Sequence, residues 1–538
     1  RFRISTPEGT RDLLFSSCRA LRQTENAVRD ALEERGYSEI ITPAVEYFDV
    51  FAQANPELDQ DQMLKIIDKS GRICVARPDN TTPIARIAAT RLDDAALPVR
   101  LYYSQKVFRS VSGDHGHKGE FLQVGAEFIG ADGLEADKDI LSAAFAALSK
   151  TGADNFRVEL GHAEIYKALM DELGADAQSA EGIRRLIENK SFAALGDALE
   201  PFKGKPAAKA LSAMPNLFGG IEVLDEVEAL TGNVRVLGAT AYLRRLYKAL
   251  DEAGYGDRIM IDLGLVHEMD YYTGIMFRGY IGGAGAAILA GGRYNALCAK
   301  FGKDMPAGGF GIDVESVADS LAGQSRPEVA TRRDTVRIAL TKGRLEKKTL
   351  ALLKAAGYDI SELEAGTRKL IFTLPDSGVE IVLSKAADVI TYVEHGVCDM
   401  GVVGKDTIME KGGSFYEMVD LGFALATKKG KDVYGGYKTP VIATKYPAVT
   451  KAFFNKKNMD VETIKIEGSV ELAPLLELAD GIVDIVETGT TLKENGLEVV
   501  EDVAPISARV IVNLASAKMK KAAIQKVIAE LENGLKNE

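Results

Sequence analysis

From residue 335 onward, short apolar runs alternate with segments in which apolar residues recur at helical spacing. The runs have the length and the β-branched content of buried strands, and the segments between them resemble amphipathic helices. This alternation predicts an α/β fold in which crossover helices join parallel strands. The strands are expected at residues 335–340, 379–383, 400–403, 441–443 and 464–466, and the helices at 346–356, 386–395 and 515–535.

The residues before 322 show a different pattern. A long amphipathic helix over residues 16–35 precedes several separate strand-like runs, with helical blocks between them. Strands and helices grouped in this way are typical of α+β folds. We therefore expect an antiparallel sheet flanked by helices. Its strands are expected at residues 73–75, 99–103, 121–124, 260–263 and 275–277.

The two patterns meet at residues 322–334, which are polar, contain Pro327 and show no apolar periodicity. Such a composition is typical of a linker. A chain of 538 residues is also too long for one hydrophobic core. We therefore predict a front domain over residues 1–321 and a back domain over residues 335–538.

Composition narrows the class of protein. The net charge of −12 argues against a broad nucleic-acid or anionic-membrane surface, which would need a basic face. No apolar run reaches the length of a membrane span, and the first residues lack the apolar core of a signal peptide. The four cysteines have no metal-site spacing, so we expect reduced thiols, no zinc site and a cytoplasmic protein.

One segment of the back domain suits a phosphorylated sugar. The apolar run 481–486 carries Asp484 and is followed by Glu487 and a turn of threonines around Gly489. Backbone N–H groups and hydroxyls at a helix N-terminus bind phosphate, and nearby carboxylates can bind ribose hydroxyls or Mg²⁺. A strand followed by such a turn is also common in α/β proteins, so this segment alone does not establish the ligand.

Cationic turns follow other strands of the back domain. Lys342, Gly343 and Arg344 come directly after the first strand, and Arg368 precedes another. Lys and Arg at such positions can bind pyrophosphate, although each turn alone could be a solvated basic loop. Ligands of open α/β sheets gather outside the carboxyl ends of the strands, where these turns lie.

The back domain resembles the short form of ATP phosphoribosyltransferase, the first enzyme of histidine biosynthesis. The matching stretches are 339–345, 392–394, 399–406, 443–447, 468–474 and 484–497. The resemblance implies a two-lobed α/β fold like that of periplasmic binding proteins, with lobe I at about 335–424 and 511–538 and lobe II at about 425–510. It implies that adenine N1 of ATP attacks C1 of phosphoribosyl pyrophosphate (PRPP) and releases pyrophosphate, with Mg²⁺ as cofactor.

The residue types agree with this chemistry. Charge builds up on the departing pyrophosphate, so cations placed there stabilise the transition state more than the ground state. Arg344 and Arg368 are the expected catalytic cations, with Lys342 assisting. No residue is assigned as a direct metal ligand. The residues expected to bind PRPP and ATP are Gly343, Asp484, Glu487, Thr488, Gly489, Thr490 and Thr491.

The front domain resembles the catalytic core of histidyl-tRNA synthetase, a class II synthetase. The matching stretches are 7–13, 42–46, 76–81, 107–109, 123–127, 269–274 and 291–294. The resemblance implies an antiparallel sheet with helices. Three positions depart from the pattern, because His267, Ser316 and Gly119 stand where the synthetases carry cations that act on ATP. Losing these cations should abolish adenylate formation, since pyrophosphate would leave uncompensated.

The amino-acid side of the pocket is retained. Carboxylates suit an ammonium group, an arginine suits a carboxylate, and Gln, Glu and Tyr can orient an imidazole. The pattern resembles the regulatory subunit of short-form ATP phosphoribosyltransferase, a synthetase paralogue, which implies histidine as inhibitor. No anticodon-binding domain is recognised, so tRNA is not an expected partner, whereas a homo-oligomer is expected. The pocket residues are Asp79, Arg109, Gln123, Glu127, Tyr272 and Tyr294.

The sequence therefore favours a fused regulatory and catalytic chain, and it leaves two alternatives. One is a functional histidyl-tRNA synthetase with an accessory domain, against which His267 and Ser316 argue. The other is a non-catalytic sensor whose back domain only binds a ligand. The presence of Arg344 and Arg368 argues against that alternative.

Overall fold

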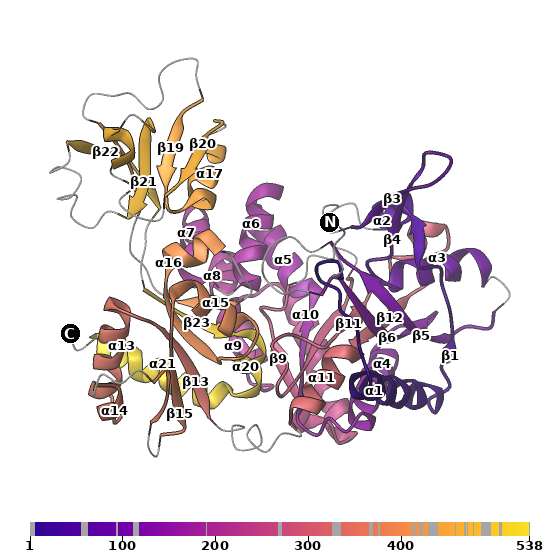
Figure 1. Ribbon diagram of the computed structural model, residues 1–538. Helices are drawn as coiled ribbons and strands as arrows, with labels where there is room; N and C mark the ends of the chain where they lie inside the picture. Colours follow the sequence, from indigo (N-terminus) through magenta and orange to yellow (C-terminus); the bar gives the residue numbers. More distant parts are fainter. Residues whose placement is uncertain are drawn as a thin grey trace. The chain divides into compact units, whose positions relative to one another are not determined.

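The computed structural model divides into two compact units, residues 1–333 and 334–538, which are described separately (Figure 1). In the described part of the chain, no helix is long and apolar enough to cross a membrane. The described residues are 6–54, 63–92, 95–110, 118–189, 191–266, 272–324, 335–364, 369–374, 377–411, 415–418, 423–428, 439–457, 459–466, 470, 472–476, 478–485, 496–504 and 508–536.

A nine-stranded sheet forms the centre of the front unit. Its central strands pair antiparallel, as expected, and β1–β5 and β7–β9 pair parallel. From one edge to the other the strands are β1 (Ser38–Glu39), β5 (Val99–Phe108), β6 (Glu120–Ile129), β12 (Ala307–Asp313), β11 (Leu289–Arg293), β10 (Ile275–Ile281), β7 (Phe156–His162), β9 (Ile259–Asp262) and β8 (Phe218–Gly219).

The main core of the front unit includes residues of the helices α1 (Ser16–Glu33), α4 (Leu134–Lys150), α10 (Val234–Glu252) and α11 (Val314–Gln324) (Figure 1). Helix α1 ends close to the predicted position, and its helically spaced Leu21, Val28 and Leu32 are buried. In α4, the ring of Phe145 stacks on Phe156 of β7. Apolar burial against these helices fixes which side of each strand points away from them.

The remaining elements of the front unit are a small sheet and further helices, and the helices between residues 163 and 228 also contribute to the main core. A small sheet has the order β2 (Val45–Tyr47), β4 (Ile73–Ala76), β3 (Lys65–Ile67). The other helices are α2 (Phe48–Ala54), α3 (Thr81–Arg91), α5 (Ala163–Leu173), α6 (Ala177–Glu188), α7 (Phe192–Leu199), α8 (Pro206–Ala213) and α9 (Val223–Glu228). Short 3-10 turns are Glu200–Phe202, Met214–Asn216, Gly256–Arg258 and Cys298–Phe301.

Two sheets make up the back unit. The six-stranded sheet has the order β14 (Ile371–Leu374), β15 (Val379–Ser384), β13 (Val336–Thr341), β16 (Met400–Gly404), β23 (Ala508–Asn513), β17 (Phe415–Met418). The five-stranded sheet has the order β20 (Glu462–Lys465), β19 (Val441–Thr444), β21 (Gly481–Ile485), β18 (Phe423–Lys428), β22 (Leu497–Ala504). We call the six-stranded sheet with its helices lobe I and the five-stranded sheet with its helices lobe II.

The expectation of purely parallel sheets is wrong at the edges of both lobes. The central pairs β13–β15, β13–β16, β19–β20 and β19–β21 are parallel. Strands that cross between the lobes, or that form a hairpin, need no crossover helix and therefore pair antiparallel. Examples are β16–β23, β18–β21 and β14–β15.

The structure shows where the front helix ends and where the chain passes from one lobe of the back unit to the other. Helix α11 extends to Gln324, so residues 322–324 of the predicted linker are helical. Strand β17 ends at Met418 in lobe I and β18 begins at Phe423 in lobe II. The return crossing lies between Ala504 and Ala508. The chain therefore changes lobe slightly before each of the two positions expected from the sequence.

The helices of the back unit are α13 (Arg344–Ala355), α14 (Ser361–Glu364), α15 (Ala386–Glu394), α16 (Lys405–Lys411), α17 (Pro447–Lys456), α18 (Leu472–Leu475), α20 (Leu514–Met519) and α21 (Lys521–Lys536). The single helix expected over 515–535 is divided at Lys520. The ammonium group of Lys520 donates to the carbonyl of Thr335 and to Asp399, which ties this residue to the start of β13.

We expect Phe145→Ala to destabilise the front unit by about 3–5 kcal/mol, because it removes a fully buried ring that also stacks on Tyr255. Urea unfolding followed by far-UV circular dichroism measures the change. Ile67→Ala serves as the control, since this side chain is 74% exposed and its loss should change the free energy of unfolding little. Equal effects of the two substitutions would contradict the assignment of the core.

Candidate functional site

The face of the front sheet opposite the helices has a floor made of glycines. The register pairs Gly309 with Glu127 and Gly311 with Gly125, and side chains alternate along each strand, so these residues share one face. A Cβ atom at Gly309 would collide with the Glu127 carboxylate, and one at Gly125 would collide with the Tyr103 hydroxyl. Glycine is required at these positions because polar side chains from neighbouring strands lie across them.

Glu127 is the most buried acid of this surface. Its side chain is 0% exposed, and it accepts hydrogen bonds from the hydroxyls of Thr81 (2.7 Å) and Tyr294. Burial raises the pKa of Glu127 to about 8, against the lowering effect of those two hydroxyls, and the charge of Asp79 raises it further. The carboxyl is therefore protonated near neutral pH until a cationic partner arrives.

Asp79 interacts electrostatically with Arg109 and with Glu127. Asp79 accepts from the backbone N–H of Thr82 at 2.7 Å. Burial raises the pKa of Asp79, and the hydrogen bonds from Thr82 and the charge of Arg109 act against that shift. Arg109 is exposed, and its guanidinium lies 5.5 Å from the centre of the Phe121 ring. An anion beside a cation can receive the two charged ends of an amino acid.

Gln123 and the tyrosines complete the pocket. Gln123 accepts from the Asn80 side chain at 3.0 Å and from the Tyr103 hydroxyl at 3.2 Å. Tyr272 is buried, and a Cβ at Gly292 would collide with its ring. Burial and the charge of Glu127 raise the pKa of Tyr103 well above its usual value. The structure thus brings together all the pocket residues expected from the sequence: Asp79, Arg109, Gln123, Glu127, Tyr272 and Tyr294.

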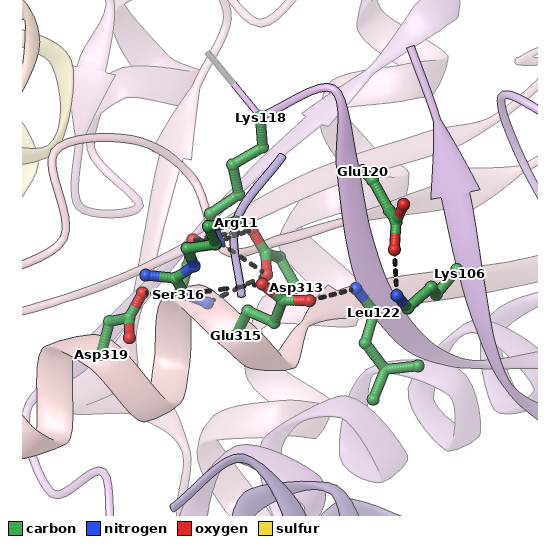
Figure 2. Close-up of polar contacts among 9 residues, drawn as sticks. All are labelled: Arg11, Lys106, Lys118, Glu120, Leu122, Asp313, Glu315, Ser316 and Asp319. Atoms are coloured by element: carbon green, nitrogen blue, oxygen red, sulfur yellow. Dashed lines mark hydrogen bonds and ion pairs between the residues drawn. The ribbon is translucent and has the colours of Figure 1, made fainter. Parts of the chain in front are cut away.

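An ion-pair network surrounds Ser316, the position where the resemblance to the synthetases leads us to expect a cation for ATP (Figure 2). The ammonium group of Lys118 lies 3.0 Å from a carboxylate oxygen of Asp313 and donates to the Ser316 hydroxyl at 2.8 Å. The same hydroxyl donates to Asp313 at 2.7 Å. Asp313 thus caps the N-terminus of α11, because it also accepts from the backbone N–H of Ser316 at 2.9 Å. The Gly119 carbonyl accepts a backbone hydrogen bond from Arg109. His267 lies outside the described residues.

The first turn of α11 is held from two further directions. Arg11 forms ion pairs with Asp319 at 2.7 Å and with Glu315 at 3.5 Å. The other oxygen of the Glu315 carboxylate accepts from the backbone N–H of Leu122. Figure 2 shows these side chains converging on α11 from separate segments of the chain. The acids here are already paired with protein cations, so the network offers no free cationic group for a triphosphate.

In lobe I of the back unit, two turns lie side by side at the carboxyl ends of β13 and β16. These strands are parallel neighbours, and the Thr341 hydroxyl donates to the carbonyl of Val402. Lys342 and Gly343 follow β13, both exposed, with Gly343 at a φ of 111° that favours glycine. Arg344 begins α13, and its side chain lies outside the described residues, as does the whole of Arg368.

Lobe II presents a matching edge. Strands β19 and β21 are parallel neighbours, and the Thr444 hydroxyl donates to the carbonyl of Val483 at 2.7 Å. Tyr446 follows β19 and Asp484 lies near the end of β21. The remaining predicted residues of this segment lie outside the described residues: Glu487, Thr488, Gly489, Thr490 and Thr491.

The two edges meet at Tyr446. Its hydroxyl donates to the Asp406 carboxylate of lobe I at 3.3 Å. Burial raises the pKa of Tyr446, and the charges of Asp406 and Asp484 raise it further. Carboxylates from both lobes therefore face one phenol. Groups at the carboxyl edges of two sheets can act together on one ligand that lies between them.

Several of these residues were not predicted as site residues. Tyr103 belongs to a predicted strand. Gly309 and Gly311, two residues apart on β12 of the same sheet, are the sequence signal that could have indicated polar side chains lying across this face. Tyr446 and Asp406 lie in stretches that carry the resemblance, yet their contact spans 40 residues of sequence and two lobes. Spacing alone gives no indication of such a pair.

Known proteins resemble this chain in two parts. The family model described as histidyl-tRNA synthetase matches residues 9–317, and the one described as ATP phosphoribosyltransferase matches residues 385–533. An ATP phosphoribosyltransferase regulatory subunit from Clostridium kluyveri is 42% identical over 318 residues, covering 59% of this chain and 81% of that protein. The same-named subunit from Clostridium acetobutylicum is 39% identical over 329 residues, covering 61% and 81%.

Solved structures agree for the front unit. A crystal structure of an ATP phosphoribosyltransferase regulatory subunit/histidyl-tRNA synthetase from Bacillus halodurans C has a TM-score of 0.56 at 27% identity and covers 72% of this chain and all of that one. A histidine–tRNA ligase subunit from Alicyclobacillus acidocaldarius has a TM-score of 0.54 at 28% identity, covering 61% and 99%. The class II synthetase-like fold expected for the front domain is thus confirmed.

Both matches fall on one polypeptide, in the order expected from the sequence, and each covers one of the two compact units. The chain therefore belongs to the ATP phosphoribosyltransferases of histidine biosynthesis, as a fusion of a synthetase-like regulatory unit with a phosphoribosyltransferase unit.

Proposed function

We propose that the front pocket binds free histidine and that the bound histidine inhibits the transferase. The observation that carries this proposal is Glu127, a fully buried carboxyl on a glycine floor that interacts with Asp79, which in turn interacts with Arg109. The ammonium group of an amino acid suits the two acids, and its carboxylate suits Arg109. The tyrosines and Gln123 supply hydroxyl and amide groups that can orient an imidazole.

The pocket binds histidine in this proposal without activating it. Adenylate formation needs cations on the departing pyrophosphate. Ser316 stands where the synthetases carry such a cation, and Lys118 is engaged by Asp313. Histidine then acts as a signal whose effect on the transferase is a coupling free energy, typically ~1–3 kcal/mol. We also propose a cytoplasmic homo-oligomer that does not bind tRNA.

In the back unit we propose that the substrates lie between the two lobes, in a fold like that of periplasmic binding proteins. Adenine N1 attacks C1 of PRPP, the C1–O bond to pyrophosphate breaks, and the electron pair leaves with pyrophosphate. Arg344 and Arg368 stabilise the charge of the leaving group, and Lys342 assists them. The ribose is assigned to Asp484 and Glu487. The 5′-phosphate is assigned to Thr488, Gly489, Thr490 and Thr491, and Gly343 allows close approach of the backbone.

Mg²⁺ fits the donor groups of this site as a partner of the substrate phosphates. Mg²⁺ usually keeps several waters and binds one or two carboxylates together with phosphates. Asp484 provides a carboxylate of that kind near the end of β21. Among the described residues there is no cluster of three or more His, Cys, Asp or Glu side chains that would hold a metal by itself. When bound, Mg²⁺ would neutralise charge on pyrophosphate.

The proposal predicts that Arg109→Ala and Glu127→Ala each weaken histidine inhibition at least about tenfold relative to the variant's own uninhibited rate. The reason is the loss of the partner for one charged end of histidine. The assay contains PRPP, ATP and Mg²⁺ and follows the absorbance of phosphoribosyl-ATP during a histidine titration. Arg100→Ala is the matched control. Arg100 lies on β5, the strand that Arg109 follows, and it forms an ion pair with Asp139. Unchanged inhibition in both pocket variants would place the effector site elsewhere.

Arg344→Ala and Arg368→Ala should each lower kcat about 100-fold or more while changing the KM for PRPP less, since these cations act on the leaving group in the transition state. Steady-state kinetics without histidine measure both constants. Lys348→Ala, an exposed position on the same helix as Arg344, is the control. Comparable turnover of an Arg variant and the control would refute the assigned role.

The raised pKa of Glu127 predicts a pH dependence of stability. The folded unit keeps this proton up to about pH 8, whereas an unfolded Glu loses it near its ordinary pKa of 4.5. The stabilising contribution is complete below about pH 4.5 and is lost as the pH rises through about 8. Urea unfolding between pH 5 and pH 8.5 should therefore show a falling free energy of unfolding.

Glu127→Gln should make that fall shallower, and a remainder is expected because the pKa of Asp79 is raised as well. Glu135→Gln, an exposed position, should keep the wild-type slope. A slope in Glu127→Gln as steep as in the wild type would contradict the assignment.

A further inference from the structure

Helix α16 of lobe I presents two carboxylates to the same turn of lobe II. Asp406 and Glu410 are four residues apart and therefore lie on one face of the helix. Asp406 accepts from the Tyr446 hydroxyl, and Glu410 accepts from the backbone N–H of Ala448 at 2.9 Å. Both contacts join α16 to the segment that begins α17.

The Asp406 contact depends on a close approach of the backbone. Gly404 ends β16, and a Cβ atom there would collide with the Asp406 carboxylate, which folds back over this residue. The second carboxylate oxygen accepts from the Thr407 hydroxyl at 3.4 Å as well as from Tyr446. The carboxylate is thereby aimed across the gap between the lobes.

Tyr446 is held from its own lobe. Its backbone N–H donates to the Thr444 hydroxyl at 2.9 Å, and that hydroxyl donates in turn to Val483 of the neighbouring strand. The side chain is 7% exposed. The phenol therefore has a fixed base in lobe II, and its hydroxyl reaches the acid of lobe I.

Glu410 supplies a helix cap from the other lobe. Helix α17 begins with Pro447 and has no capping side chain of its own at Tyr446. The N–H groups of Ala448 and Val449 both donate to Glu410. A carboxylate at a helix N-terminus also interacts favourably with the helix dipole. Glu410 therefore adds a second contact between the two lobes, next to that of Asp406.

The position of these contacts matters for the reaction. Strand β16 is the neighbour of β13, which carries Lys342 and Arg344 at its end, and β19 is the neighbour of β21, which carries Asp484. The contact between Asp406 and Tyr446 therefore joins the two edges to which the substrate groups are assigned. If the edges separate, the cations of lobe I can no longer reach the pyrophosphate of a PRPP molecule whose ribose is held by lobe II.

We propose that Tyr446 and Asp406 are positioning residues for the phosphoribosyl transfer. Their hydrogen bond, which we call the latch, holds the two lobes at the reactive separation, and the Glu410 cap on α17 adds a second contact between the lobes. The inference rests on the proposed assignment of substrate groups to both lobes.

Kinetics test the positioning role. Tyr446→Phe keeps the ring and removes only the hydroxyl, and we expect kcat to fall roughly tenfold with a smaller change in both KM values, because misplacement of reacting groups acts on the transition state. Tyr358→Phe is the matched control, since its hydroxyl donates to Glu530 within lobe I. Equal effects of the two substitutions would overturn the proposal.

Asp406→Asn separates positioning from charge. The amide oxygen of Asn can still accept the Tyr446 hydrogen bond, so this variant should keep most of the activity that Asp406→Ala loses. If Asp406→Asn is as impaired as Asp406→Ala, the carboxylate acts through its charge, and the positioning role is wrong.

A distance measurement tests the latch without relying on activity. Spin labels at Lys348→Cys in lobe I and Leu476→Cys in lobe II, both exposed, report the separation of the lobes in the full chain carrying Cys18→Ser. Dilution with unlabelled protein suppresses distances between chains. Tyr446→Phe should broaden the ligand-free distance distribution, and Tyr358→Phe should leave it unchanged. An unchanged distribution in Tyr446→Phe would overturn the latch.

Calorimetry with PRPP and Mg²⁺ tests the underlying assignment separately. A marked loss of PRPP affinity in a lobe II variant, Asp484→Asn, together with a smaller loss in Arg344→Ala, supports substrate groups in both lobes. Undiminished PRPP binding in both variants would refute that assignment, even where the distance distributions show that the latch exists.

Discussion

The regulatory half of this enzyme depends on a carboxyl group placed where water cannot reach it. Glu127 lies over Gly309 with two hydroxyls as its hydrogen-bond donors, and its pKa rises to about 8. Such a group prefers to be neutral until a cation arrives. The glycines of the neighbouring strand, the tyrosines above them and the helices behind the sheet together make this burial possible. A site of this kind responds to an amino acid because binding changes its charge as well as its contacts.

The catalytic half depends on a different constraint, which is the distance between the edges of two sheets. The groups assigned to the substrates follow strands of two separate sheets, so their chemistry depends on how closely two edges approach. Tyr446 lies at that approach, with Asp406 of one lobe and Asp484 of the other acting on it. A regulatory unit can influence such an arrangement through small changes in lobe separation, because reacting groups tolerate little displacement. A fold of two lobes is therefore suited to control by a distant effector.

The sequence predicted the elements that carry strong periodicity, whereas the assignment of residues on short motifs to one histidine pocket stays a prediction. Helix α1 and the central strands follow from local patterns. Contacts between distant segments could not be predicted. Lys118 and Asp313 are 195 residues apart, and their ion pair depends on the sheet register. The antiparallel edges of the lobes were missed because crossing strands look like any other apolar run. The break at Lys520 was missed because a tertiary contact with Asp399 overrides helix propensity.

The central claim is that histidine binds at Glu127 and is linked to the transferase. Isothermal titration of histidine into the intact chain, with and without PRPP and Mg²⁺, tests both parts. The account predicts saturable binding that is lost in Glu127→Ala, and a histidine affinity that changes when PRPP is present, because linkage between two sites is reciprocal. Histidine binding that is equally tight in Glu127→Ala, or that is indifferent to PRPP, would contradict it.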